Sequence, residues 1–310
     1  MAGKKVKQFA ATTLIPTIKH SHRYLVVYNT RLVDGELTRG RYENLIIDGE
    51  KVQAYSGEMS AGSRKRLQDA CELMIAITQK KWYNHPLTGK RLSFRIALIT
   101  TTLSAPQGGI SDREIKKGLL EPLLRKLRKY GLRNYIWKAE RQRNGNIHFH
   151  IFVDAFIDKT DLRNIWNRLQ AKYHFIQAFR TKHGHSDPNS TDIKAVVTED
   201  GLIKYMLKYM IKPVDKAEQK EIGRPDDKKD TGKVWDCSKA LKLKNPTAEF
   251  CESGEYELID QGVNLGELKE VRTDYCWIYI FSGDNWRDYI PASISSRYIQ
   301  WLADAKAMSV

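Results

Sequence analysis

The stretch NYIWKAERQRNGNIHFHIFVD, residues 134–154, decides the fold of this chain. It contains two strand-like segments, 134–140 and 147–153, on either side of a turn signal at Asn144-Gly145. Two strands joined by so short a connection predict an antiparallel β-hairpin.

The second strand carries a His-Phe-His pattern. Side chains two residues apart in a strand lie on the same face, so His148 and His150 project together while Ile147, Phe149 and Ile151 project to the other side. Two imidazoles on one face suit a metal ion. A pair of histidines that form cross-strand hydrogen bonds on a solvated face is the alternative.

The hairpin register decides whether Glu140 joins them. A two-residue turn at Asn144-Gly145 would place Glu140 opposite Phe149, on the wrong face, whereas a three-residue turn from Arg143 to Gly145 places it opposite His148. Three-residue turns commonly end with glycine in the left-handed conformation, and Gly145 is at that position. We therefore expect Glu140, His148 and His150 to bind one divalent ion, Mn²⁺, Mg²⁺ or Zn²⁺.

The segments around the hairpin predict an α+β fold. Strands are expected at 94–103 and 192–197, and helices at 112–130 (kinked at Pro122), at 158–173 (capped by Asp158 or Thr160) and at 201–212. The order β-α-β-β-α-β-α predicts a ferredoxin/RRM-like split-βαβ antiparallel sheet with helices on one face.

Four segments are expected along the chain. Residues 1–92 form an N-terminal extension of unknown role, 93–213 the core, 214–233 a charged linker or loop, and 234–310 a C-terminal extension. The first contains strand-like pieces at 24–28 and 44–47 and a helix at 63–82, and the last contains a strand at 275–281 and a helix at 293–303.

The helix at 201–212 carries two tyrosines on its polar side. Its apolar face is formed by Leu202, Ile203, Met206, Leu207, Met210 and Ile211. Tyr205 and Tyr209 fall opposite that face, and each is followed one turn later by a lysine, Lys208 and Lys212. An adjacent ammonium favours the phenolate, so a tyrosine, a lysine and a metal form a coherent set for attack on a phosphodiester.

Composition narrows the class of partner. The 52 lysines and arginines exceed the 37 acidic residues, and the net charge of +15 suits a nucleic acid. The four cysteines show no CxxC spacing, which fits a reducing cytoplasm, and neither a signal peptide nor a membrane span is expected.

The His-Phe-His strand followed by a YxxKYxxK helix resembles the HUH endonuclease superfamily. The similarity covers roughly residues 94–212 and is greatest to rolling-circle replication initiators of small single-stranded DNA phages and plasmids. Segment 232–242 also looks like one that follows the tyrosine helix in phage initiators. In conjugative relaxases the tyrosine precedes the histidines, and a helicase loop of the GxxxxGK[ST] type is absent here.

The resemblance implies a role for each matched residue. His148 and His150, with Glu140 as third ligand, would hold the ion. Tyr209 would attack the DNA to give a 5′-phosphotyrosyl intermediate and a free 3′-hydroxyl primer, with Tyr205 as the second tyrosine. Lys212, and less directly Lys208, would assist.

Partners and alternatives follow. The expected partners are single-stranded origin DNA, contacted by Lys138, Arg141 and Arg143, and a host helicase and polymerase in the cytoplasm of a bacterial cell. The alternatives are a two-tyrosine HUH transposase and a non-enzymatic RRM-like nucleic-acid-binding module.

Overall fold

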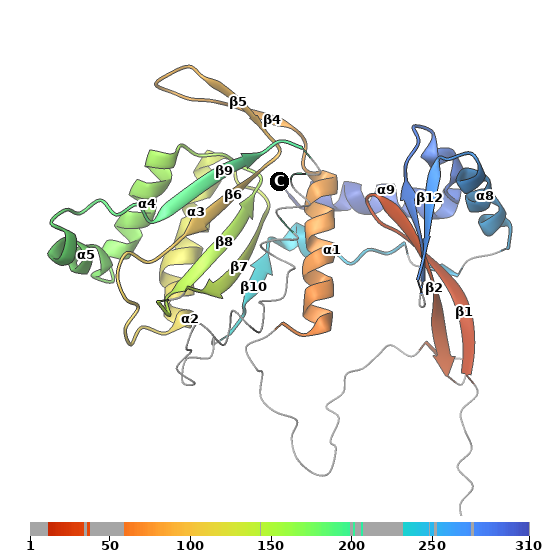
Figure 1. Ribbon diagram of the computed structural model, residues 1–310, viewed down its shortest axis with the longest axis horizontal. Coiled ribbons are helices and arrows are strands. Elements are labelled where there is room, and N and C mark those ends of the chain that lie inside the picture. Colours follow the sequence, from red (N-terminus) through yellow and green to blue (C-terminus); the bar gives the residue numbers. More distant parts are fainter. Residues whose placement is uncertain are drawn as a thin grey trace, which may run out of the picture. The chain divides into compact units, whose positions relative to one another are not determined.

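The computed structural model describes residues 12–33, 36–37, 59–142, 144–198, 201, 206, 232–247, 249–250, 253–273 and 276–309. Contacts divide the chain into two compact units. The first unit is formed by residues 1–54 and 244–303, and the second by 55–243 and 304–310. Each unit has its own antiparallel sheet and helices, which confirms the α+β class (Figure 1).

The second unit contains a five-stranded sheet in the order β10-β7-β8-β6-β9, with every described pairing antiparallel. Its strands are β6 (Ile96–Thr101), β7 (Tyr135–Arg141), β8 (Ile147–Val153), β9 (Thr191–Val196) and β10 (Trp235–Cys237). β8 therefore lies between β6 and β7, which are joined by a helical crossover. Two-residue periodicity sends alternate side chains of β8 into opposite layers.

The helical crossover consists of several short pieces. They are α2 (Asp112–Ile115), a π-helical turn (Lys116–Leu120), α3 (Glu121–Leu127) and a 3₁₀ turn (Arg128–Tyr130). Ser111 caps α2 through a capping box with Glu114. Pro122 lies in the first turn of α3, where its missing N–H costs nothing, so the break expected at Pro122 takes the form of a π-helical turn before it.

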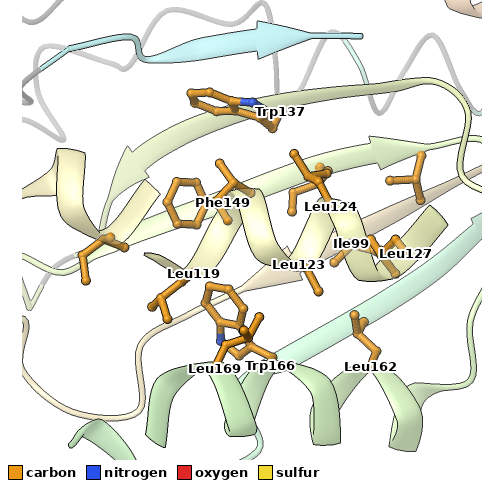
Figure 2. Close-up of a cluster of buried hydrophobic side chains, with 14 of the residues drawn as sticks. Ile99, Leu119, Leu123, Leu124, Leu127, Trp137, Phe149, Leu162, Trp166 and Leu169 are labelled. Atoms are coloured by element: carbon orange, nitrogen blue, oxygen red, sulfur yellow. The ribbon is translucent and has the colours of Figure 1, made fainter. Parts of the chain in front are cut away.

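The core of the second unit lies between this crossover, the sheet and α4 (Lys159–Ala171). Asp158 is the N-cap of α4, as one of the two expected capping residues. Figure 2 shows the leucines of the crossover between Trp137 and Phe149 of the hairpin strands and the apolar side of α4. Ile147, Phe149, Ile151 and Val153 all belong to this core, so the other face of β8 carries the histidines. A further helix, α5 (Phe175–His183), follows α4 and was not expected from the sequence.

The opposite face of this sheet is not bare of helices, contrary to the expectation of helices on one face. The helix α1 (Ala61–Ile77) packs near β10, and Trp235 Nε1 donates a hydrogen bond of 2.8 Å to Ser63 Oγ. Trp235 is the partner of Lys138 and so shares its face of the sheet. The apolar side of α1, with Leu67, Cys71 and Met74, had no partner visible in the sequence, and a distant strand provides it.

The first unit is a second sheet built from both ends of the chain. Its main order is β11-β1-β2-β13-β12, and β3 pairs with β2. The strands are β1 (Thr12–His20), β2 (Tyr24–Val33), β3 (Glu36–Leu37), β11 (Glu249–Phe250), β12 (Leu268–Arg272) and β13 (Cys276–Phe281). With the helices α8 (Ser253–Asn264) and α9 (Ala292–Ala307), it encloses a separate core around Ile18, Leu25, Ile259, Tyr279 and Ile294.

The unit boundaries differ from the four segments expected from composition. Helix α1 and the hairpin of β4 (Lys81–Asn84) and β5 (Arg91–Phe94) belong to the second unit, while β1 and β2 join the C-terminal strands. The pairing of β2 with β13 is the physical reason, because it joins segments about 250 residues apart. The expected strand at 44–47 lies outside the described residues. No helix among those described is long and apolar enough to cross a membrane.

Candidate metal centre

The β7–β8 hairpin has the three-residue register expected from the sequence. Glu140 pairs with His148, and Lys138 pairs with His150. Gln142 N donates to Asn146 O at 2.9 Å, and Gly145, with φ of 79°, is in the left-handed conformation. This register places Glu140 on the face that carries both histidines.

The two imidazoles converge at their Nε2 atoms. His148 Nε2 and His150 Nε2 are 3.0 Å apart, and His150 Nε2 lies 3.4 Å from Glu140 Oε2. Donors that share one ion at ~2.0–2.2 Å from it are separated by roughly 3.0–3.5 Å, so these spacings fit a common divalent ion. The residues therefore suit the metal that the resemblance implies.

Glu140 is shared with a second partner. Lys138 Nζ lies 2.8 Å from Glu140 Oε1, and the Lys138 side chain is buried. As the side chains stand, no group of three or more His, Cys, Asp and Glu residues in the described ranges is arranged to hold an ion. The carboxylate would complete the ligand set by turning from Lys138 toward the two Nε2 atoms.

Electrostatics favours a donor set ready for a cation. Burial, followed by the neighbouring His150, lowers the pKa of His148 to about 4, against a raising effect of Glu140. Burial alone would raise the pKa of Glu140, but hydrogen bonds from His150 and Lys138 and the charge of Lys138 outweigh it and lower this pKa to about 2. At neutral pH the site therefore holds a neutral His148 imidazole and an ionised carboxylate.

The other ring nitrogens differ in their surroundings. His150 Nδ1 lies 3.4 Å from Thr100 Oγ1 on the neighbouring strand β6. An Nδ1–H donated to this hydroxyl leaves the Nε2 lone pair free for an ion. His148 Nδ1 is buried and has no hydrogen-bond partner among the described residues.

A buried polar network fixes the hairpin turn to the loop before α2. Gln107 accepts hydrogen bonds from Ile147 N (3.0 Å) and Arg141 Nη1 (3.2 Å) and donates to Asp112 Oδ1 (2.8 Å). Asn146 Oδ1 accepts from Gln107 N at 2.8 Å. Because these bonds hold both strands at the turn, they fix the register on which Glu140 and His148 depend.

The structure gives Arg141 and Lys138 internal partners. Arg141 is largely buried and forms an ion pair with Asp112, also donating to Gly145 O at 3.0 Å. Lys138 neutralises Glu140. Their expected contacts with DNA stay predictions, and Arg143 lies outside the described residues.

The tyrosine helix also lies largely outside the described residues. Tyr205, Lys208, Tyr209 and Lys212 are not described, so their placement beside the histidines stays a prediction. Gly201 and Met206 are described as helical, and Met206 is buried, as expected for the apolar face.

Sequence reasoning missed the residues that support the site. Thr100 could have been found, because a hydroxyl in a strand next to a His-Phe-His strand is a candidate partner for an imidazole. Gln107 and Asp112 had no local signal, since their partners are 29–40 residues away in sequence.

Comparison with known proteins gives one family match. A family model described as a replication-associated protein of the ORF2 type matches residues 97–214, less than half of the chain, from β6 through the hairpin and the tyrosine helix. Neither curated proteins nor solved structures provide a match. The matched segment is thus similar to a replication-associated protein family, and it contains both His148 and Tyr209.

Proposed function

We propose that this chain initiates rolling-circle DNA replication by nicking single-stranded origin DNA with a tyrosine. The convergence of Glu140, His148 and His150 across one hairpin is the observation that carries the proposal. The match of residues 97–214 to a replication-associated family supports it. The strand order β7-β8-β6-β9 supports a ferredoxin/RRM-like HUH core.

The proposed reaction is a transesterification. The Tyr209 hydroxyl oxygen attacks the scissile phosphorus, a Tyr O–P bond forms and the bond to the 3′ oxygen breaks, which leaves a 3′-hydroxyl primer. Lys212, with Lys208, stabilises the phenolate and the charge on the phosphate. In the reverse step a 3′-hydroxyl attacks the phosphotyrosine and rejoins the strand, and Tyr205 provides a second nucleophile for alternate cycles.

His148, His150 and Glu140 would hold a divalent ion, Mn²⁺ or Mg²⁺. When bound, this ion supplies Lewis-acid polarisation of the scissile phosphate. Thr100 orients the His150 ring, and the Gln107 network keeps the hairpin in register. Unwinding and synthesis would fall to a host helicase and polymerase in the cytoplasm of a bacterial cell.

The test is a covalent adduct assay. Wild-type protein, single-stranded origin DNA and Mn²⁺ should give a band that survives denaturation, and chelation should abolish it. Tyr205→Phe/Tyr209→Phe and His148→Ala/His150→Ala should each abolish the adduct.

The outcome separates the proposal from its main rival. A non-enzymatic nucleic-acid-binding module with structural histidines would bind the DNA but form no adduct, with or without metal. Adduct formation by the double Phe variant at the wild-type level would show that neither tyrosine is the nucleophile.

A further inference from the structure

The β4–β5 hairpin of the second unit has no role in the proposed chemistry. It extends away from the five-stranded sheet, beyond β9 (Figure 1). Residues 80–95, KKWYNHPLTGKRLSFR, contain five lysines and arginines and no acidic residue. Such a run predicts a polyanionic partner or a solvated surface, and the contacts of the hairpin decide between them.

One face of the hairpin attaches it to the unit. Tyr83 and Phe94 both pack against Phe156, with ring centroids 4.9 Å and 5.7 Å apart. Lys81 Nζ donates to Asp154 O at 2.7 Å, and His85 Nε2 lies 3.2 Å from Asp158 Oδ2. These contacts hold the hairpin at the end of β8.

The other face carries an exposed tryptophan between two cations. Trp82 is 53% exposed, the Arg91 guanidinium lies 4.0 Å from its ring centroid, and Lys80 Nζ lies 5.4 Å from it. None of the described carboxylates forms an ion pair with Lys80, Lys90 or Arg91. Positive charge is therefore held beside an aromatic surface without being neutralised.

A tryptophan in the first unit shows the contrast. Trp277 is 39% exposed and also has an arginine over its ring, Arg272 at 4.9 Å. That arginine is neutralised by Glu270, and Trp277 also packs against Tyr256. Of the two tryptophans, it is the one on the hairpin that combines exposure with unneutralised cations.

We propose that the outer face of the β4–β5 hairpin, formed by Lys80, Trp82 and Arg91, is a second binding site for single-stranded DNA. A base stacks on Trp82 while Lys80 and Arg91 contact the flanking phosphates. This inference extends the proposed function but does not depend on the tyrosine chemistry.

The position of the hairpin suits a strand that runs from the metal centre. It is anchored at Asp154, four residues along an extended segment from His150, or roughly 13 Å at ~3.3 Å per residue. That span corresponds to about four nucleotides at ~3.4 Å each. DNA held on the hairpin can therefore reach the His148–His150 pair within one strand.

A lipid surface fits the hairpin less well. Trp82 and Leu92 lie on opposite faces, because Trp82 pairs with Ser93 and Leu92 with Tyr83. Leu87 is the one large apolar side chain at the tip, between His85 and Lys90. A membrane-inserting element would gather its apolar side chains on one face.

The test is binding of a labelled oligothymidylate, measured by fluorescence anisotropy in EDTA so that no cleavage occurs. Trp82→Ala should weaken binding about 5-fold or more, and Trp82→Phe should restore most of it, because stacking is retained. Lys80→Ala/Arg91→Ala should reduce the slope of log affinity against log salt by about 1.4, or about 0.7 for each lost phosphate contact. The matched control Trp277→Ala should bind as wild type does.

Three results would overturn the inference. They are wild-type affinity in Trp82→Ala, an unchanged salt slope in the double variant, and equal weakening in Trp277→Ala. Binding to vesicles of phosphatidylcholine and phosphatidylserine that is lost in Trp82→Ala, with DNA binding unaffected, would assign the hairpin to a membrane instead. Failure of the adduct assay with the expected oligothymidylate results intact would reject the nicking mechanism and leave the hairpin site standing.

Discussion

At neutral pH the His148 imidazole is uncharged, because burial and the neighbouring His150 lower its pKa to about 4. The unfolded chain has a histidine pKa near ~6.5, so between about pH 6.5 and 4 the unfolded state binds a proton that the folded state does not. His148 therefore reduces the free energy of unfolding as the pH falls through this window. NMR titration of the metal-free protein should give a midpoint near pH 4 for this ring.

Glu140→Gln provides the control for that titration. Because the Glu140 charge raises the pKa of His148, its removal should move the midpoint lower still. A midpoint near ~6.5 in the wild-type protein would contradict the burial seen here.

The ammonium of Lys138 competes with an ion for Glu140. Lys138→Met keeps much of the apolar stem and removes the charge 2.8 Å from Oε1. Mn²⁺ affinity, measured by calorimetry, should increase about 10-fold, since a hydrogen bond to a charged group contributes roughly 1.5 kcal/mol. The metal-free variant should unfold at lower temperature than wild type, because its carboxylate is left half-buried without this partner. Weaker Mn²⁺ binding would show that Lys138 supports the site rather than competing for Glu140.

At the scale of elements, the hairpin turn sets the site. Gly145 has φ of 79° and open space around its Cα, so Gly145→Ala adds backbone strain without a clash. We expect a loss of about 1–2 kcal/mol in the free energy of unfolding, measured with urea. Gly109→Ala is the matched control, because Gly109 has equally open space and no positive φ. Equal effects of the two substitutions would argue against a left-handed turn at Gly145.

The Arg141–Asp112 pair tests whether Arg141 serves the fold or the DNA. Both side chains are largely buried, so Arg141→Met or Asp112→Asn alone should cost about 3–5 kcal/mol. The double variant should cost less than the sum of the two, as a double-mutant cycle would show. If Arg141→Met keeps wild-type stability and only weakens DNA binding, the expected phosphate contact is correct instead.

The hairpin and its supports differ in how far they could be predicted. The period of two, the position of Gly145 and the Phe149 alternation determine the strands and the register locally, so Glu140 could be paired with His148 from the sequence. Gln107 and Asp112 approach the hairpin from a loop whose path depends on the packed crossover. No local pattern encodes such a contact.

At the scale of the molecule, the sheet of the first unit could not be predicted for a similar reason. Strand β2 pairs with β13, and β1 with β11, across more than two hundred residues. Period-two patterns show that each strand exists but not which one it joins. Composition therefore suggested two extensions where the chain forms one unit.

Two separate cores predict two unfolding transitions. Ile294 is fully buried in the core of the first unit, and Leu123 in that of the second. Ile294→Ala and Leu123→Ala should each cost about 2–5 kcal/mol and shift a different transition in urea, followed by hydrogen exchange of the two sheets. A single transition shifted alike by both substitutions would show that the units unfold together.

Mn²⁺ should separate the same two transitions by linkage. Because Glu140, His148 and His150 all belong to the second unit, an ion bound there stabilises that unit by about 2.7 kcal/mol at a concentration about 100 times its Kd. The transition of the first unit should stay where it is. His148→Ala/His150→Ala removes two of the three donors, so the shift should vanish in that variant while the Ile294→Ala effect persists. A Mn²⁺ shift that survives the loss of both histidines would place the ion elsewhere in the chain, and the candidate centre would then be a structural His–Glu–Lys cluster.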